Sequence, residues 1–175
     1  NLSSKKFSNI KSPTFYEGEV DMKLNPDCVR DVLLYLEENL GYTDYVGALQ
    51  HKEIQICTIP DYFSTTYSKE DVNYSIEKLY EARFISLVNI ASDRDGYIVN
   101  AYVNDITYIG HEFLNNIRPK NVWDATKEGA SKLGLMSMHA LSFISSKVIE
   151  SIITNPTVIN KIIDQTQTKL NQFVK

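Results

Sequence analysis

The stretch from residue 67 to residue 118 constrains the fold of this chain more than any other, because its periodicity changes in a set order. A stripe of apolar residues at helical spacing after Ser68 predicts a helix over 69–82. Two runs rich in β-branched and aromatic residues, 84–90 and 97–103, predict strands. The polar turn between these runs contains a glycine, so the two strands are expected to form a hairpin.

A further helix is predicted after the hairpin, from Thr107 as a capping residue to a stop before Pro119. Helix, hairpin and helix in this order are typical of the second half of a winged helix-turn-helix domain, with the hairpin as the wing. An ordinary α-β-β-α segment of another α+β fold is the alternative. Winged helices usually act by binding a macromolecule, most often DNA, so the order points to binding by analogy of fold.

The residues before this stretch supply the elements that a winged helix needs at its beginning. Asn25 and the proline after it predict a helix over 26–40. Residues 41–51 are expected to form a loop, and 52–59 a strand that pairs with the hairpin. Residues 60–67 are expected to hold one short helical turn.

The predicted fold class is therefore α+β, with a winged helix-turn-helix domain followed by a helical C-terminal extension. Residues 1–21 are interpreted as an N-terminal extension or tag remnant, 22–118 as the winged-helix domain, and 119–175 as the extension. The extension is too apolar to stand alone in water, so it is expected to pack on the domain or on a second copy. Trp123 is predicted to fill the core between the extension and the domain, and burial is also predicted for Leu141, Ile144 and Val148. The alternative for Trp123 is an anchor residue of an interface.

Composition excludes several classes of protein. The 175 residues contain no apolar run long enough for a membrane span and no secretory signal pattern. The two cysteines lack CxxC spacing, which indicates a reducing cytosol. The three histidines lack partners at metal-ligand spacing, and no phosphate-binding or nucleophile motif is present, so we expect no metal, no cofactor and no enzymatic activity.

The charge of the predicted domain opposes a simple DNA-binding interpretation. Residues 22–110 contain 7 Lys or Arg and 14 Asp or Glu, whereas residues 111–175 contain 8 and 5. A DNA-binding domain normally presents a basic face, and this domain is acidic.

Two sets of residues are candidates for contact with a partner. Those for DNA contact lie on the recognition helix and the wing: Lys69, Asn73, Tyr74, Lys78 and Arg94. Acidic neighbours such as Glu77 and Glu81 would repel phosphates there, and the alternative is a solvated helix face. Those for a protein interface are the tyrosines of expected loops and the apolar residues of the last helix: Tyr42, Tyr45, Tyr62, Tyr67, Ile159, Ile162, Ile163 and Phe173.

Three segments resemble a small family of unknown function found mainly in phages and prophages of low-GC Gram-positive bacteria. They are MKLNPDCVRDVLLYLEEN from Met22, YSKEDVNYSIEKLYEARFI from Tyr67 and DITYIGHEFLNNIRPKNVWDATK from Asp105. The resemblance covers about residues 22–151 and implies a winged-helix core, a mobile-element setting and no established activity. Where that family tends to place glycine after the recognition helix, this chain has Arg83, which costs about 1 kcal/mol if the backbone there is left-handed.

Two functions follow from these observations. The first is a non-enzymatic phage or prophage regulator that binds duplex DNA, in the cytoplasm of a bacterial host. The alternative is an acidic module that binds a host or phage protein and does not bind DNA. Either form is expected to self-associate through the C-terminal helices, and the surface potential across the recognition helix and wing would distinguish the two.

Overall fold

The computed structural model describes residues 23–96, 98–155 and 157, which form an α+β fold with a helical C-terminal region. The order along the chain is α1 (Pro26–Asn39), β1 (Gly41–Tyr45), β2 (Ala48–Lys52), β3 (Ile54–Gln55), the 3₁₀ turn η1 (Ile56–Thr58), α2 (Ile59–Tyr62), α3 (Lys69–Glu81), β4 (Ile85–Ser92), β5 (Ile98–Ile106), α4 (Tyr108–Ile117), α5 (Lys120–Leu133) and α6 (Met138–Ile153). In this described part, no helix is long and apolar enough to cross a membrane.

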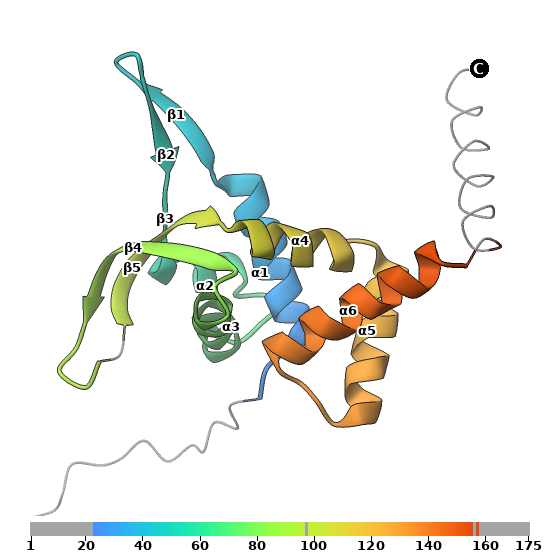
Figure 1. Cartoon of the computed structure of the whole chain (residues 1–175). Helices are drawn as coiled ribbons and strands as arrows, with labels where there is room; N and C mark the ends of the chain where they lie inside the picture. Colours follow the sequence, from blue (N-terminus) through green and yellow to red (C-terminus); the bar gives the residue numbers. More distant parts are fainter. Residues whose placement is uncertain (1–22, 97, 156, 158–175) are drawn as a thin grey trace, which may run out of the picture.

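Two small antiparallel sheets stand on one side of the helices (Figure 1). The three-stranded sheet has the order β3-β5-β4, so β5 is central and pairs with β4 from Ile85↔Ile106 to Ser92↔Ile98. This pairing confirms the predicted hairpin around 93–96. The second sheet is the β1–β2 hairpin, which projects away from the body of the molecule (Figure 1).

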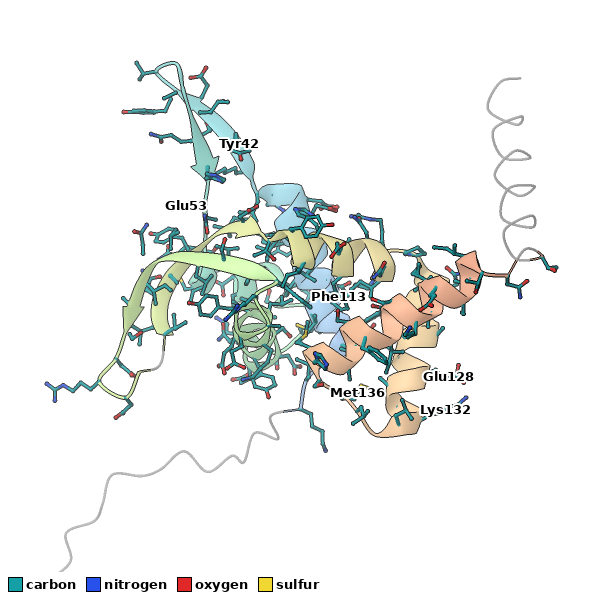
Figure 2. The ribbon with its side chains drawn as sticks, viewed as in Figure 1. Tyr42, Glu53, Phe113, Glu128, Lys132 and Met136 are labelled. Carbon is teal, nitrogen blue, oxygen red and sulfur yellow. The ribbon has the colours of Figure 1, made fainter. Side chains whose placement is uncertain are left out.

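The core lies where α1, α3 and α4 meet the three-stranded sheet. Each helix contributes a stripe of buried apolar side chains, as its helical spacing predicted. The largest fully buried side chains include Leu33 and Leu36 of α1, Leu79 of α3, and Phe113 of α4. Figure 2 labels Phe113 on α4. Phe113 also packs against Phe84 before β4, with ring centroids 4.9 Å apart.

Hydrogen bonds to helix ends set the positions of α1 and α4. The Asn25 side chain accepts from the Cys28 backbone N–H at 3.2 Å and caps α1, as predicted. One turn later, the Arg30 guanidinium donates to the carbonyls of Ile117 and Arg118 at 3.0 and 2.9 Å. Arg30 therefore satisfies carbonyls at the C-terminal end of α4, where a positive charge is favourable.

Helix α4 approaches the beginning of β4 so closely that one position requires glycine. A Cβ atom at Gly110 would collide with the Phe84 carbonyl oxygen and would lie 2.9 Å from the Ile106 Cγ2. Thr107 reinforces this junction: its N–H donates to the Phe84 carbonyl at 2.9 Å, and its hydroxyl donates to the Arg83 carbonyl at 2.7 Å.

The C-terminal region is helical, as predicted, and Trp123 is part of the core with 3% of its surface exposed. Its indole N–H donates to Asp27 at 2.7 Å, which ties α5 to the start of α1. Leu141 of α6 is fully buried, while Ile144 and Val148 are half-buried at the same helix surface. Gly134 ends α5 in the left-handed conformation, with φ 67°.

Two local expectations are wrong. Residues 41–51, expected as a loop, are mostly in the β1–β2 hairpin, so Tyr42 and Tyr45 belong to strand β1 and not to a loop. The strand expected over 52–59 is short in the structure, because after β3 the chain turns into η1 at Ile56. The two strands could not be recognised in the sequence, because their residues are exposed on both faces and do not alternate between apolar and polar.

Candidate interaction surface

Helix α3 and the β4–β5 hairpin are the elements that carry the five DNA-contact candidates. Ser68 accepts a hydrogen bond from the Asp71 N–H at 3.0 Å and fixes the start of α3. Val72, Ile76 and Leu79 are buried, so the opposite side of the helix faces outward. The chain then reverses at Arg83, whose backbone is left-handed with a φ of 62°, so the cost considered for a residue other than glycine applies here.

The two lysines of α3 are engaged by carboxylates of their own chain. Lys69 Nζ lies 2.9 Å from Asp61 Oδ1. Lys78 Nζ lies 2.9 Å from Glu77 Oε1 and 2.8 Å from Glu81 Oε2, and it sits 5.0 Å above the ring of Tyr74. Hydrogen bonds to Glu81 and Glu77 raise the pKa of Lys78 well above its usual range, and the hydrogen bond to Asp61 raises the pKa of Lys69.

The five DNA-contact candidates do not share one surface. Lys69 and Asn73 line a groove between α3 and the β4–β5 hairpin. Tyr74 and Lys78 lie on the other flank of α3, in a hollow shared with Met136 and His139. Arg94 is exposed in the turn that joins β4 and β5.

The groove between α3 and the β4–β5 hairpin has a volume of about 510 Å³. We call it the α3–β5 groove. Its apolar lining comes from η1, α2, α3 and both strands of the hairpin: Ile56, Pro60, Ile76, Leu87, Ile98 and Val99. Glu77 and Glu81 add carboxylates along the α3 wall, and the exposed thiol of Cys57 lies at the η1 wall. An apolar groove with acidic walls suits a ligand that is partly apolar and partly basic.

The tyrosine candidates lie in three separate places. Tyr42 and Tyr45 are on the projecting β1–β2 hairpin, with 66% and 65% of their surface exposed. Figure 2 labels Tyr42 on this hairpin. Tyr62 of α2 packs against Tyr35, with ring centroids 4.4 Å apart. Tyr67 is half-buried, and its hydroxyl donates to Asp31 at 2.6 Å. Burial and the neighbouring Asp31 raise the pKa of Tyr67 well above its usual range.

The apolar candidates Ile159, Ile162, Ile163 and Phe173 lie outside the described residues. The neighbouring helix α6 does present apolar side chains to solvent, since Phe143 and Ile153 are 60% and 61% exposed.

The described part of the chain contains no group of three or more His, Cys, Asp or Glu able to hold a metal ion. His111 lies on α4 with its Nδ1 3.9 Å from Glu37 Oε1, at the surface between α4 and α1. Glu37 is held more closely by Arg118, at 2.7 Å. That hydrogen bond lowers the pKa of Glu37.

Sequence reasoning missed the apolar tip of the β1–β2 hairpin and the groove itself. Val46 and Leu49 at that tip are 92% and 76% exposed. The turn between the strands consists of Val46 and Gly47, whose φ values of 53° and 82° are both positive, as in a type I′ turn. Gly47 is a residue typical of such a turn. Val46 before it argues against one, because β-branched residues rarely adopt a positive φ.

These features define a class: a small α+β protein in which an apolar groove with acidic walls separates an amphipathic helix from a β-hairpin. The chain belongs to the DUF2513 family of hypothetical proteins, whose sequence profile matches residues 23–136. It is 27% identical over 133 residues to an uncharacterized protein of Haemophilus influenzae. The aligned region covers 75% of this chain and 99% of that protein. No solved structure shows a significant match.

Proposed function

We propose that this chain is a non-enzymatic winged-helix protein that acts by binding another protein through the α3–β5 groove. The order α1-β3-α2-α3-β4-β5 and the sheet order β3-β5-β4 support the winged-helix assignment, with α3 as the recognition helix and β4–β5 as the wing. A phage or prophage setting, in which a small factor engages a host or phage protein, is part of the proposal.

The observation that carries this proposal is that both lysines of α3 are paired with carboxylates of the same chain. Binding to duplex DNA gains most of its free energy from cations that neutralise phosphates. Lys69 and Lys78 are already neutralised by carboxylates of the same chain. A phosphate at either lysine would have to displace a carboxylate and would then lie beside it, so this face favours a protein ligand over a nucleic acid.

Binding of duplex DNA is the second candidate, because the wing and recognition helix have the arrangement that reads DNA in many winged helices. Asn73 and Arg94 are exposed and could contact a base edge and a phosphate. If the protein binds duplex DNA, a dimer formed through the C-terminal helices would be needed to bring together enough positive charge to neutralise the phosphates.

A salt titration of binding to random duplex DNA tests the choice between the two. We expect weak binding with a shallow dependence on salt, because few phosphates are neutralised. The double variant Glu77→Gln, Glu81→Gln releases Lys78 and should bind the same duplex more tightly and with a steeper slope. Tight and steeply salt-dependent binding by the unchanged protein, lost in Lys69→Ala, Lys78→Ala and Arg94→Ala, would establish DNA binding instead.

Capture through the groove tests the protein-binding function directly. Cys57 is exposed and Cys28 is buried, so a photoactivatable maleimide will label the groove selectively. The labelled protein is irradiated in a lysate of the bacterium that expresses it, and the cross-linked species are identified by mass spectrometry. The matched control carries Cys57→Ser and Ser151→Cys, which moves the label to the exposed surface of α6. A partner captured from both positions alike, or from neither, contradicts the proposal.

A further inference from the structure

The central strand of the three-stranded sheet is covered along only part of one edge. Within the described residues, β3 pairs with two positions of β5, Tyr102 and Val103, although β5 extends from Ile98 to Ile106. The Gln55 side chain reaches one step further and donates to the Asn100 side chain at 3.0 Å. After that, η1 turns away, and no strand among residues 23–96 and 98–155 pairs with the β5 backbone from Ile98 to Ala101 on that side.

This open edge borders the α3–β5 groove. Ile98 and Val99 both line the groove. The pairing with β4 passes from Asn100 to Ile98, so Val99 is the extra residue of a bulge in β5. The groove meets β5 at this bulge, in the part of the strand that β3 leaves uncovered. An extended segment lying there would find unpaired backbone groups on one side and the apolar walls on the other.

The opposite edge of the sheet is less suited to accept a strand. The register of β4 against β5 shifts between Val88 and Ala91 and again between Ala91 and Ser92. Asn89 within this irregular segment has a φ of 55°. Bulges of this kind protect an edge strand from pairing with other chains. The sheet therefore has an edge at β4 that is irregular around Asn89, and an edge at β5 that β3 leaves uncovered before Tyr102 and that carries a bulge of its own at Val99.

The charge around the groove specifies the chemistry of the ligand. Residues 54–106, which contribute all of the groove lining, contain four Lys or Arg and eight Asp or Glu. Glu77 and Glu81 line the groove with side chains 49% and 55% exposed, and Glu81 also borders the hollow on the other flank of α3. The two carboxylates share one lysine, Lys78, so the pair keeps one negative charge that the lysine does not balance. A ligand that carries lysine or arginine beside its apolar residues is complementary to these walls.

We propose that the partner enters as an extended peptide segment, which adds a strand to the open edge of β5, inserts apolar side chains into the α3–β5 groove and directs basic side chains to Glu77 and Glu81. This inference rests on the proposed function and specifies its partner. Strand addition draws affinity from main-chain hydrogen bonds and specificity from pockets for alternate side chains, and the groove and edge together provide both.

The test uses fluorescein-labelled heptapeptides in which lysine alternates with valine, leucine or isoleucine, with binding to the full chain measured by fluorescence anisotropy. The matched peptides carry glutamate in place of every lysine. We expect the lysine peptides to bind at least tenfold more tightly than the glutamate peptides. N-methylation of alternate backbone nitrogens of the peptide removes hydrogen-bond donors and leaves the side chains unchanged. It should abolish binding when the methylated nitrogens are those that point toward β5.

Variants of the protein locate the site. Val99→Ser should weaken binding about tenfold, as expected for loss of one buried valine side chain. Ile90→Ser changes an exposed apolar residue of the irregular strand and should leave affinity within about twofold. The peptide should also slow alkylation of Cys57. Equal binding of the N-methylated peptides, or no binding by any peptide, overturns strand addition. Capture of a partner at Cys57 in the experiment above would still support the proposed function, so the two failures are distinguishable.

Discussion

Replacing Gly110 by alanine tests whether α4 and β4 meet as closely as the structure describes. In an ordinary helix, Gly→Ala raises stability by about 0.8–1 kcal/mol. At Gly110 the added methyl group would collide with the Phe84 carbonyl and crowd the Ile106 side chain at 2.9 Å. The colliding atom is backbone, so rotation of a side chain cannot relieve the contact, and α4 must move away from the sheet.

Two contributions determine the magnitude. Overpacking costs about 1–3 kcal/mol. Separation of α4 from the sheet would also weaken the hydrogen bond from the Thr107 N–H to Phe84, worth about 0.5–1.5 kcal/mol. After subtraction of the gain in helix propensity, Gly110→Ala should lower the free energy of unfolding by about 0.5–3.5 kcal/mol, with a central value of about 2 kcal/mol.

Urea denaturation measures this change, with far-UV circular dichroism and the fluorescence of the single tryptophan as two probes. Gly129→Ala is the matched control, because its Cβ would lie 3.2 Å from a methyl group of Ile144, which can shift. We expect that variant to be neutral or up to about 1 kcal/mol more stable. If Gly110→Ala is as stable as the unchanged protein, with the same dependence on urea, the close approach of α4 to β4 is refuted.

Three further predictions concern the core, the projecting hairpin and an ion pair. Trp123→Ala should cost about 3–5 kcal/mol of unfolding free energy, and Trp123→Phe clearly less; a loss below about 1 kcal/mol in urea denaturation would contradict a core role. Val46→Asn replaces a valine that has a left-handed backbone with a residue that adopts this conformation more easily, so the local free energy of opening of the hairpin should rise by about 1 kcal/mol. Amide hydrogen exchange at Thr43 should therefore slow, and unchanged or faster exchange would contradict backbone strain at Val46. Arg118 lowers the pKa of Glu37, so this stabilisation is present above the unfolded pKa of about 4.3 and is lost as the pH falls through the folded pKa. The stability difference between the unchanged protein and Glu37→Gln should therefore shrink in urea titrations below about pH 4, and a pH-independent difference would exclude the ion pair as its source.

Local signals explain why much of the fold could be predicted. Asn25, Ser68 and Thr107 cap helices through hydrogen bonds to residues three positions later, so the signal lies within one turn of the chain. The apolar stripes of these helices and the turn between β4 and β5 are equally local. The predicted boundaries of α1 and α3 therefore differ from the observed ones by one residue at the C-terminal end.

The parts that could not be predicted depend on contacts between distant residues or lack a pattern. The β1–β2 hairpin has no buried face, so its strands carry no alternation of apolar and polar residues. The α3–β5 groove combines residues from η1, α3 and β5, which no short window of sequence contains. The pairing of Lys78 with Glu81 was within reach, because residues three apart on a helix are neighbours. The acidic charge of the domain follows from the sequence, whereas the carboxylate partners of Lys69 and Lys78 are seen only in the structure.

The β1–β2 hairpin has a consequence for how this family could diversify. Gly41 and Lys52 are directly opposite each other in the pairing, so the chain leaves and rejoins the body at nearly the same point. Residues 42–52 are all exposed, and the core contains no side chain from them. Changes in the length or sequence of this appendage would leave folding of the body almost unaffected. Natural selection can therefore change this exposed surface independently of stability, and a reporter or affinity sequence could be inserted at Val46 and Gly47.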